Sequence, residues 1–345
     1  MKYSILVPVY KSQYLSECID SILGQTYEDF ELIIVNDASP YPIDDIVRTY
    51  SDIRIHYFTN TVGYGAVNVV DNWNKCLSYA QGEYVICMGD DDRLLPKCLE
   101  EYNHLIQKYP DLDIYHARTE LIDERGELVN LQESRPEWES ALSALWHQCC
   151  CHRIQYIGDF LFRTSSLRRE GGFYKLPLAI FSDNISSIRA AKRKGVANTQ
   201  KICFQYRVNK YTISNNGNPR ILAESIKNAY DWFLVFLQDL QCDDTDEKFR
   251  KLLFSGELRE HMYQMMMGVV RNDLNKVGPS AIAYWKSHYY ALGITEQEID
   301  TTINNYKHWY YSHQGIHYTI KLKFYALRAK LGIRTRIRNL FKLSK

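Results

Sequence analysis

Residues 84–92 read Tyr-Val-Ile-Cys-Met-Gly-Asp-Asp-Asp, a short apolar run that leads directly into three consecutive aspartates. Such a β-rich run is typical of a buried strand. Similar runs precede it at residues 4–9, 30–35 and 53–58. Residues 14–23, after a candidate helix cap at Ser12, and residues 67–81 and 97–108 have helical spacing instead. The alternation predicts an α/β fold with a mostly parallel sheet flanked by helices.

Polar residues follow three of the predicted strands. They are Tyr10, then Asn36-Asp37-Ala38-Ser39, then Asp90-Asp91-Asp92. In parallel sheets, ligands bind beyond the carboxyl ends of the strands. We therefore expect these three clusters to meet at one edge of the sheet.

Three adjacent carboxylates repel one another, so an electrostatic partner is expected where this strand ends. Mg²⁺ or Mn²⁺ fits, because such ions take few protein carboxylates and complete their shells with water and phosphate oxygens. The alternative is that the aspartates cap a helix beginning near Pro96. The triplet alone does not decide between the two interpretations.

Dinucleotide and P-loop sites are disfavoured by the glycine pattern. No glycine follows the first predicted strand, and no Gly-Lys-Ser/Thr sequence occurs. The loop Gly63-Tyr64-Gly65-Ala66 lacks a third glycine at Asn68. We interpret its glycines as flexible or turn-forming residues.

Several motifs together resemble the inverting family-two glycosyltransferases of the GT-A fold. The resemblance covers about residues 3–215. It rests on the segment 4–39, on Asn74 and Gly82-Glu83-Tyr84 before the acidic turn and Pro96 after it, and on Gly171-Gly172-Phe173, Asp183, Arg189, Gly195, Tyr206-Arg207 and Ser214 in the family's order. It implies a GT-A type fold followed by a helical C-terminal region.

The resemblance also implies roles for individual residues in binding a nucleotide-sugar. Pro8, Val9 and Tyr10 would hold the nucleoside together with Asp37, whose carboxylate would accept hydrogen bonds from the base. An Asx-turn closing at Ser39 is the structural alternative for Asp37.

Further donor contacts are implied for Asn74, Asp90 and Arg207. Asp91, with Asp92 in support, would hold the Mn²⁺ or Mg²⁺ that bridges the phosphates. The expected cofactor is therefore one of these two ions.

Asp183 stands at the family's general-base position. A base there would take the proton of the acceptor hydroxyl. Its structural alternative is a helix N-cap, because residues 184–194 have a helical pattern. Two departures from the family pattern stand out, Gly89 where an aspartate is common and Ser182 where a glutamate is frequent.

Cysteine and histidine residues cluster at His147, Cys149-Cys150-Cys151 and His152. Adjacent cysteines diverge in direction and lack the Cys-x-x-Cys pairing of structural zinc sites. We therefore expect buried thiols rather than zinc. The odd total of nine scattered cysteines fits a reducing cytosol.

The last 27 residues differ in charge from the rest. Residues 319–345 hold nine basic side chains and no acid, eight more than the chain's net charge of +1, so residues 1–318 carry a net charge of −8. Ile333, Ile337, Leu340 and Phe341 share one helical face, which predicts an interfacial helix on an anionic membrane surface. Docking of this helix on the protein is the alternative.

These patterns divide the chain into a GT-A domain at 1–218, a helical region at 219–318 and a membrane-associating tail at 319–345. We expect an enzyme at the inner face of the cell membrane that uses a nucleotide-sugar donor, with UDP as the expected nucleotide, and a lipid-linked saccharide acceptor of O-antigen or capsule assembly. Nucleic acid is not an expected partner, given the −8 charge. The alternative is a non-catalytic nucleotide-sugar-binding or scaffold subunit.

Overall fold

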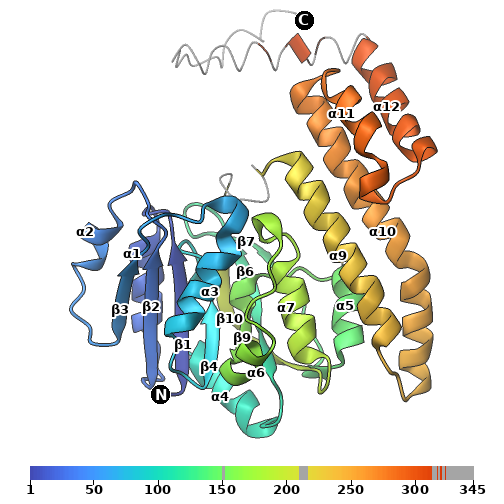
Figure 1. Cartoon of the computed structure of the whole chain (residues 1–345). Coiled ribbons are helices and arrows are strands. Elements are labelled where there is room, and N and C mark those ends of the chain that lie inside the picture. The colour runs from blue at the N-terminus through green and yellow to red at the C-terminus, as the bar shows by residue number, and fades with distance from the viewer. Residues whose placement is uncertain (150–151, 210–216, 313–316, 318, 321–322, 324–345) are drawn as a thin grey trace, which may run out of the picture. The chain divides into compact units, whose positions relative to one another are not determined.

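The computed structural model describes residues 1–149, 152–209, 217–312, 317, 319–320 and 323 (Figure 1). The chain divides into two compact units, residues 1–265 and residues 266–345. The predicted boundaries at 218/219 and 318/319 remain predictions. The tail predicted as an interfacial helix lies almost entirely outside the described residues.

The first unit is built on one mixed sheet in the order β3-β2-β1-β4-β9-β6-β10-β5. Its N-terminal half is parallel and consists of β1 (Tyr3–Val9), β2 (Phe30–Asn36), β3 (Ile55–Thr59) and β4 (Tyr84–Cys87). These are the four strands expected from the sequence, within two residues at each end.

The second half of the sheet breaks the parallel pattern. Strand β9 (Phe160–Arg163) lies antiparallel between β4 and β6 (Ile114–Ile122), and β10 (Val196–Arg207) runs parallel to β6. The short strands β5 (Arg93–Leu94), β7 (Leu128–Leu131) and β8 (Trp138–Glu139) pair antiparallel at the margins. The α/β fold is thus confirmed, while the parallel pattern is confined to the first four strands and the β6–β10 pair.

Helices flank the sheet. They are α1 (Leu15–Leu23), α2 (Ile43–Val47), α3 (Val69–Tyr79), α4 (Cys98–Lys108), α5 (Ala141–Cys149), α6 (Thr164–Arg169) and α7 (Ser182–Ala191), with 3-10 turns η1 (Ala66–Asn68), η2 (Ile157–Asp159) and η3 (Pro177–Ala179). The expected cap at Ser12 is wrong, because α1 begins after Tyr14 and has no side-chain cap.

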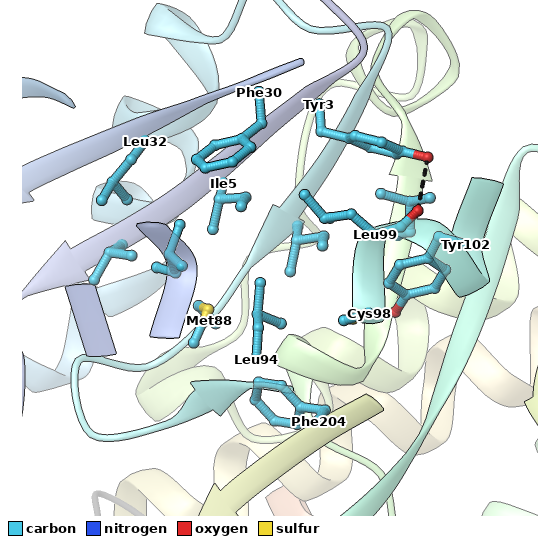
Figure 2. Packing of buried hydrophobic residues seen from close by; sticks show 14 of the residues in the cluster. Tyr3, Ile5, Phe30, Leu32, Met88, Leu94, Cys98, Leu99, Tyr102 and Phe204 are labelled. Atoms are coloured by element: carbon cyan, nitrogen blue, oxygen red, sulfur yellow. Dashed lines mark hydrogen bonds between the residues drawn. The ribbon is translucent and has the colours of Figure 1, made fainter. Parts of the chain in front are cut away.

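Apolar residues of β1 and α4 pack against one another and join the sheet to the helices that flank it (Figure 2). Tyr3 and Ile5 are fully buried and pack with Leu99 of α4 and Phe204 of β10 in one core cluster. The buried Tyr3 hydroxyl donates to the Leu99 carbonyl at 3.3 Å. Such burial fixes the strand ends in place, and the candidate site lies on those ends.

The helices after residue 218 confirm the helical C-terminal region expected from the sequence. They are α9 (Pro219–Asp239), α10 (Thr245–Val277), α11 (Ala281–His288), η4 (Tyr290–Leu292) and α12 (Glu296–Tyr311). Helix α9 belongs to the first unit. Within the second unit, the buried Trp285 indole donates to Asp273 at 2.9 Å. In the described part of the chain, no helix is long and apolar enough to cross a membrane.

Candidate functional site

The ends of β1, β2 and β4 carry the predicted polar clusters to one edge of the sheet, because these strands are parallel neighbours. Asp90 joins two of the ends. Its Oδ2 accepts hydrogen bonds from the backbone N–H groups of Tyr10 at 2.8 Å and Lys11 at 2.7 Å. The acidic turn after β4 is therefore tied directly to the segment after β1.

The other two aspartates of the turn face different partners. Asp91 Oδ2 accepts from the side-chain amide of Asn209 at 2.6 Å. Asp92 is buried, and its two oxygens accept from the backbone N–H groups of Arg207 at 2.9 Å and Gly89 at 3.3 Å. Of the two residues predicted to hold a metal, Asp92 has both oxygens hydrogen-bonded, whereas within the described part of the chain only Oδ2 of Asp91 accepts a hydrogen bond from another residue.

The alternative that these aspartates cap the next helix is wrong. Strand β5 intervenes, and α4 begins at Cys98 after Lys97, which makes no side-chain cap.

Negative charge accumulates in the turn. Burial and the neighbouring charge of Asp91 raise the pKa of Asp90 to about 6 and that of Asp92 well above its usual value. Burial also raises the pKa of Asp91. Like charges in a poorly solvated turn favour protonation or a bound cation.

A divalent ion fits Asp91 by donor chemistry, because Mg²⁺ and Mn²⁺ sites commonly use one or two carboxylates plus water and phosphate. In the described residues, no group of three or more His, Cys, Asp or Glu side chains is arranged to hold a metal.

Gly89 allows the turn to close. A Cβ at this position would lie 2.9 Å from Asp91 Oδ1 and 2.9 Å from Asp92 Oδ2. The aspartate that the family often has here does not fit this arrangement. Glycine at position 89, where the family often has aspartate, therefore leaves the space that the Asp91 and Asp92 carboxylates occupy.

Arg207 holds the acidic turn rather than facing an open site. Its guanidinium is buried, donates to the Asp91 carbonyl at 2.9 Å, forms an ion pair with Glu17 at 2.7 Å and lies 4.0 Å from the Tyr14 ring centroid. Burial acts to raise the pKa of Glu17, but hydrogen bonds from Arg93 and Arg207 outweigh it and lower that pKa. These contacts give Arg207 a positioning role, and its predicted donor contact remains a prediction.

Asp37 is enclosed by the glycine loop that follows β3. Its carboxylate accepts from the Tyr64 N–H at 2.8 Å, the Gly65 N–H at 2.9 Å and the Asn60 amide at 3.0 Å. A Cβ on Gly63 would lie 2.5 Å from the Asp37 carbonyl, so this loop needs glycine for close approach. The glycines are thus more than flexible turn residues.

The Asx-turn interpretation of Asp37 is wrong. The preceding residue, Asn36, accepts the Ser39 N–H at 2.9 Å.

The remaining predicted donor contacts differ in exposure. The Val9 side chain is fully buried and Pro8 partly so, whereas Tyr10 is 47% exposed and contacts the exposed Tyr41 ring edge-on. Asn74 donates to the Phe173 carbonyl at 3.1 Å and accepts the Phe173 N–H at 2.8 Å. Tyr10 is the accessible member of this set, and Asn74 joins α3 to the segment before α7.

Asp183 lies in the first turn of α7. The helix begins at Ser182 after Phe181, so the N-cap interpretation of Asp183 is wrong by two residues. Burial raises the pKa of Asp183 to about 7, although the N–H groups of Asn184 and Asp183 itself lower it. A carboxyl group with this pKa can accept a proton near neutral pH.

Backbone strain surrounds both isolated aspartates. Among the described residues, the non-glycine residues with positive φ are Ala38, Leu178, Ala179 and Phe181. Ala38 follows Asp37, and the other three lie within five residues before Asp183. Each such conformation costs on the order of 1–3 kcal/mol and persists only when the surroundings hold it.

The surroundings of the strained segment come from three elements. Turn η3 packs against η1, α3 and α9. From α9, the buried Ser225 hydroxyl donates to the Pro177 carbonyl at 2.8 Å, and the Phe233 ring contacts Phe181 edge-on at 5.8 Å. Helix α9 therefore supports the segment that leads to Asp183.

A stacked tyrosine pair lies next to the residue that holds the acidic turn, because Tyr206 directly precedes Arg207. The ring centroids of Tyr156 and Tyr206 lie 3.5 Å apart at an interplanar angle of 9°. Burial raises the pKa of Tyr206, and the negative charges of Asp92 and Asp183 both add to this rise. The acidic turn and Asp183 thus contribute to the electrostatic environment of the same phenol.

Two members of this site were missed in the sequence, Asn209 and Tyr156. Asn209 stands two residues after Arg207 beyond a strand end, a position that could have marked it. Tyr156 lies far from any quoted motif and had no such signal.

The histidine–cysteine cluster is described only at His147, Cys149 and His152, and these three are not arranged to hold a metal. The Nδ1 atoms of His147 and His152 lie 3.3 Å apart, and Cys149 is half-buried. Burial lowers the pKa of His147 to about 4. Cys150 and Cys151, which were expected to be buried thiols, lie outside the described residues.

Comparisons with known proteins agree with this geometry. Residues 4–169 match the model for glycosyl transferase family 2. An uncharacterized glycosyltransferase of Rickettsia typhi is 32% identical over 174 residues, covering 48% of this chain and 53% of the relative. One from Methanocaldococcus jannaschii is 33% identical over 141 residues, covering 39% and 46%.

A further relative is the poly(ribitol-phosphate) beta-glucosyltransferase of Bacillus spizizenii, 34% identical over 134 residues, covering 36% of this chain and 20% of the relative. The matched region thus spans about half the length of the Rickettsia and Methanocaldococcus relatives and a smaller share of the Bacillus relative.

Among solved structures, S. aureus TarS 1-349 in complex with UDP-GlcNAc superposes with a TM-score of 0.62 at 15% sequence identity, covering 89% of this chain and 92% of that one. This likeness establishes the shared fold. The region that carries the acidic turn after β4, residues 4–169, is therefore assigned to glycosyl transferase family 2.

Proposed function

We propose that this protein is an inverting glycosyltransferase that moves one sugar from a nucleotide-sugar, expected to be a UDP-sugar, to a lipid-linked saccharide acceptor in the assembly of a surface polysaccharide such as O-antigen or capsule. One observation carries the proposal: the acidic turn at the strand ends is accompanied by a separate carboxyl group, Asp183, whose pKa burial raises to about 7 and whose charge, like that of Asp92, raises the pKa of Tyr206. This arrangement supplies a cation site for the leaving group and a base for the acceptor.

The donor and acceptor classes draw support from similar proteins. S. aureus TarS has been solved with UDP-GlcNAc, which supports a nucleotide-sugar donor here. The Bacillus spizizenii relative glucosylates poly(ribitol-phosphate), which supports a polymeric acceptor of the cell surface. The predicted basic tail supports an acceptor held at a membrane.

The chemistry follows from the carboxylates. A bound Mn²⁺ or Mg²⁺ supplies Lewis-acid neutralisation of the departing diphosphate. Asp91, held by Asn209, would be its protein ligand, and Asp92 with Arg207 would keep Asp91 in place. Asp37 and the loop that encloses it, next to exposed Tyr10, would form the nucleoside end of the site.

Asp183 would complete the reaction on the acceptor side. Its carboxylate takes the proton of the acceptor hydroxyl while that oxygen forms a bond to the anomeric carbon and the bond to the diphosphate breaks. One displacement of this kind inverts the anomeric centre. Asp183 needs no metal for this step.

A panel of nucleotide-sugars, incubated with the full-length protein with and without Mn²⁺, tests the proposal. Release of nucleoside diphosphate with one donor, stimulated by Mn²⁺, is the expected result. No hydrolysis or transfer with any donor would contradict it. Calorimetric binding of a nucleotide-sugar without turnover would instead favour a non-catalytic binding subunit.

Membrane association needs its own measurement. Full-length protein should sediment with anionic liposomes, and a chain ending at Tyr318 should not. Equal sedimentation of the two would remove the tail as the anchor.

A further inference from the structure

A cavity of about 360 Å³ lies between α6, α7 and α9, away from the strand ends that carry the acidic turn. Ser166 and Arg169 line it from α6, Lys192 and Arg193 from the end of α7, and Trp232 and Phe236 from α9. Its volume falls within the range of small-molecule sites. The mechanism proposed above uses none of these residues.

Basic residues outnumber acidic ones in the lining of this cavity, which holds Arg169, Arg189, Lys192 and Arg193 against Asp113, Glu170 and Asp239. Arg189 is paired with Glu170 at 3.0 Å and Asp113 with Arg163 at 3.5 Å. Among the described residues, Arg169, Lys192 and Arg193, which line the same space, take part in no ion pair, although Arg169 donates to the Ser166 hydroxyl at 3.0 Å. Since residues 1–318 carry a net charge of −8, this local excess of cations stands out and favours an anion.

Apolar and hydrogen-bonding groups accompany the cations. The rings of Trp232 and Phe236 stack at 5.2 Å and 13°, and the Lys192 ammonium lies 5.9 Å from the Phe236 ring centroid. Ser166 offers a hydroxyl and Asp239 a carboxylate to the same space. A bare phosphate would use the cations alone, whereas a sugar phosphate would also use the apolar wall and the mixed donors and acceptors.

The cavity is separate from the candidate reaction site. Asp183 and Lys192 lie nine residues apart on one helical path, about 14 Å at the rise of an α-helix. We propose that the cavity between α6, α7 and α9 is a second ligand site that binds an anionic saccharide, with the phosphate on the Lys192, Arg193 and Arg169 side and the sugar ring against Trp232 and Phe236. This proposal does not depend on the function proposed for the strand-end site.

Calorimetric titration of the full-length protein with glucose 1-phosphate tests the site, with UDP and Mn²⁺ present to occupy the strand-end site. Glucose 1-phosphate should bind. The double variant Lys192→Ala/Arg193→Ala should bind it at least about 10-fold more weakly, since each charge-assisted hydrogen bond contributes about that factor or more. Lys248→Ala, which removes an exposed charge of α10 outside the cavity, should bind it as the wild type does.

Three results would overturn the proposal. They are no binding of glucose 1-phosphate by the wild type, equal binding by the double variant, and equal weakening by Lys248→Ala. Inorganic phosphate is the matched probe for the saccharide part. If it binds as tightly as glucose 1-phosphate, the cavity is an anion site only and the saccharide assignment is wrong.

Discussion

The backbone N–H of Arg207 donates to Asp92 Oδ1 at 2.9 Å and joins two residues that lie 115 positions apart in the chain. Through this bond the end of β10 holds the acidic turn that follows β4. The Arg207 side chain adds a second tie to the Asp91 carbonyl at 2.9 Å. The turn is therefore shaped by the second half of the sheet as much as by its own strand.

Asp91 and Asp92 should respond differently to the same substitution. In Asp92→Asn, an amide NH₂ replaces one of the two oxygens that accept from the Arg207 and Gly89 N–H groups, so one of these donors loses its acceptor. The free energy of unfolding should fall by about 1–3 kcal/mol. Asp91→Asn should leave thermal stability nearly unchanged and abolish Mn²⁺-dependent UDP binding. Thermal unfolding and calorimetry on both variants check this, and a reversed pattern would contradict the assignment of Asp91 as the ligand.

Gly89→Ala should damage the site without touching a catalytic group. The added Cβ would lie 2.9 Å from an oxygen of each of Asp91 and Asp92, so the carboxylates must move. We expect a loss of about 1–3 kcal/mol in stability, as for other overpacked positions, and weaker Mn²⁺-dependent UDP binding.

Gly256→Ala is the matched control for Gly89→Ala. No atom lies within 4 Å of its added Cβ, and an alanine in helix α10 should be neutral or stabilising. Equal effects of the two substitutions would show that the space around Gly89 is not what matters.

Asp183 should impose a pH dependence on both rate and stability. Because its pKa is raised to about 7, the folded protein holds this proton where the unfolded chain has lost it. The stability that this group contributes is therefore present near pH 4 and lost as the pH rises through 7. Transfer requires the carboxylate, so kcat should rise with pH and level off above about 7.

Asp183→Asn should abolish transfer, leave UDP affinity nearly intact and remove this part of the pH-dependent stability. Rate profiles and thermal unfolding between pH 5 and 9 measure both. Retained turnover would exclude Asp183 as the base. Asp231→Asn, at an exposed position of α9, serves as the control.

Ser225→Ala tests whether α9 positions Asp183. Losing the 2.8 Å hydrogen bond leaves the Pro177 carbonyl with only the longer bond from the Ile180 N–H at 3.3 Å, beside three positive-φ residues, at a cost of about 0.5–1.5 kcal/mol. We expect kcat to fall while the KM for the donor stays unchanged, because the acidic turn is untouched. Ser78→Ala, which removes a hydroxyl bonded only within α3, should leave kcat as it is. An unchanged kcat in Ser225→Ala would limit Ser225 to a role in stability.

Local patterns in the sequence were sufficient for the parallel half of the fold. Apolar runs at residues 4–9, 30–35 and 84–88 predict strands because burial on both faces needs continuous hydrophobicity. Their polar ends then meet at one edge because parallel neighbours share direction. Tyr10, Asp37 and the acidic turn could be brought together on this ground alone.

Only the tertiary structure decided what each of those side chains faces. Strand β9 enters antiparallel between β4 and β6, a pairing that no local pattern encodes. The distant partners of Asp90, Asp91 and Asp92 come from two segments, residues 10–11 and residues 207–209, and Tyr156 reaches Tyr206 in the same way. The sequence by itself determined that an acidic turn ends a buried strand, since burial is a local property of residue type. Which aspartate has both oxygens hydrogen-bonded and which has only one bonded to another residue depended on long-range hydrogen bonds that exist only after the sheet has closed.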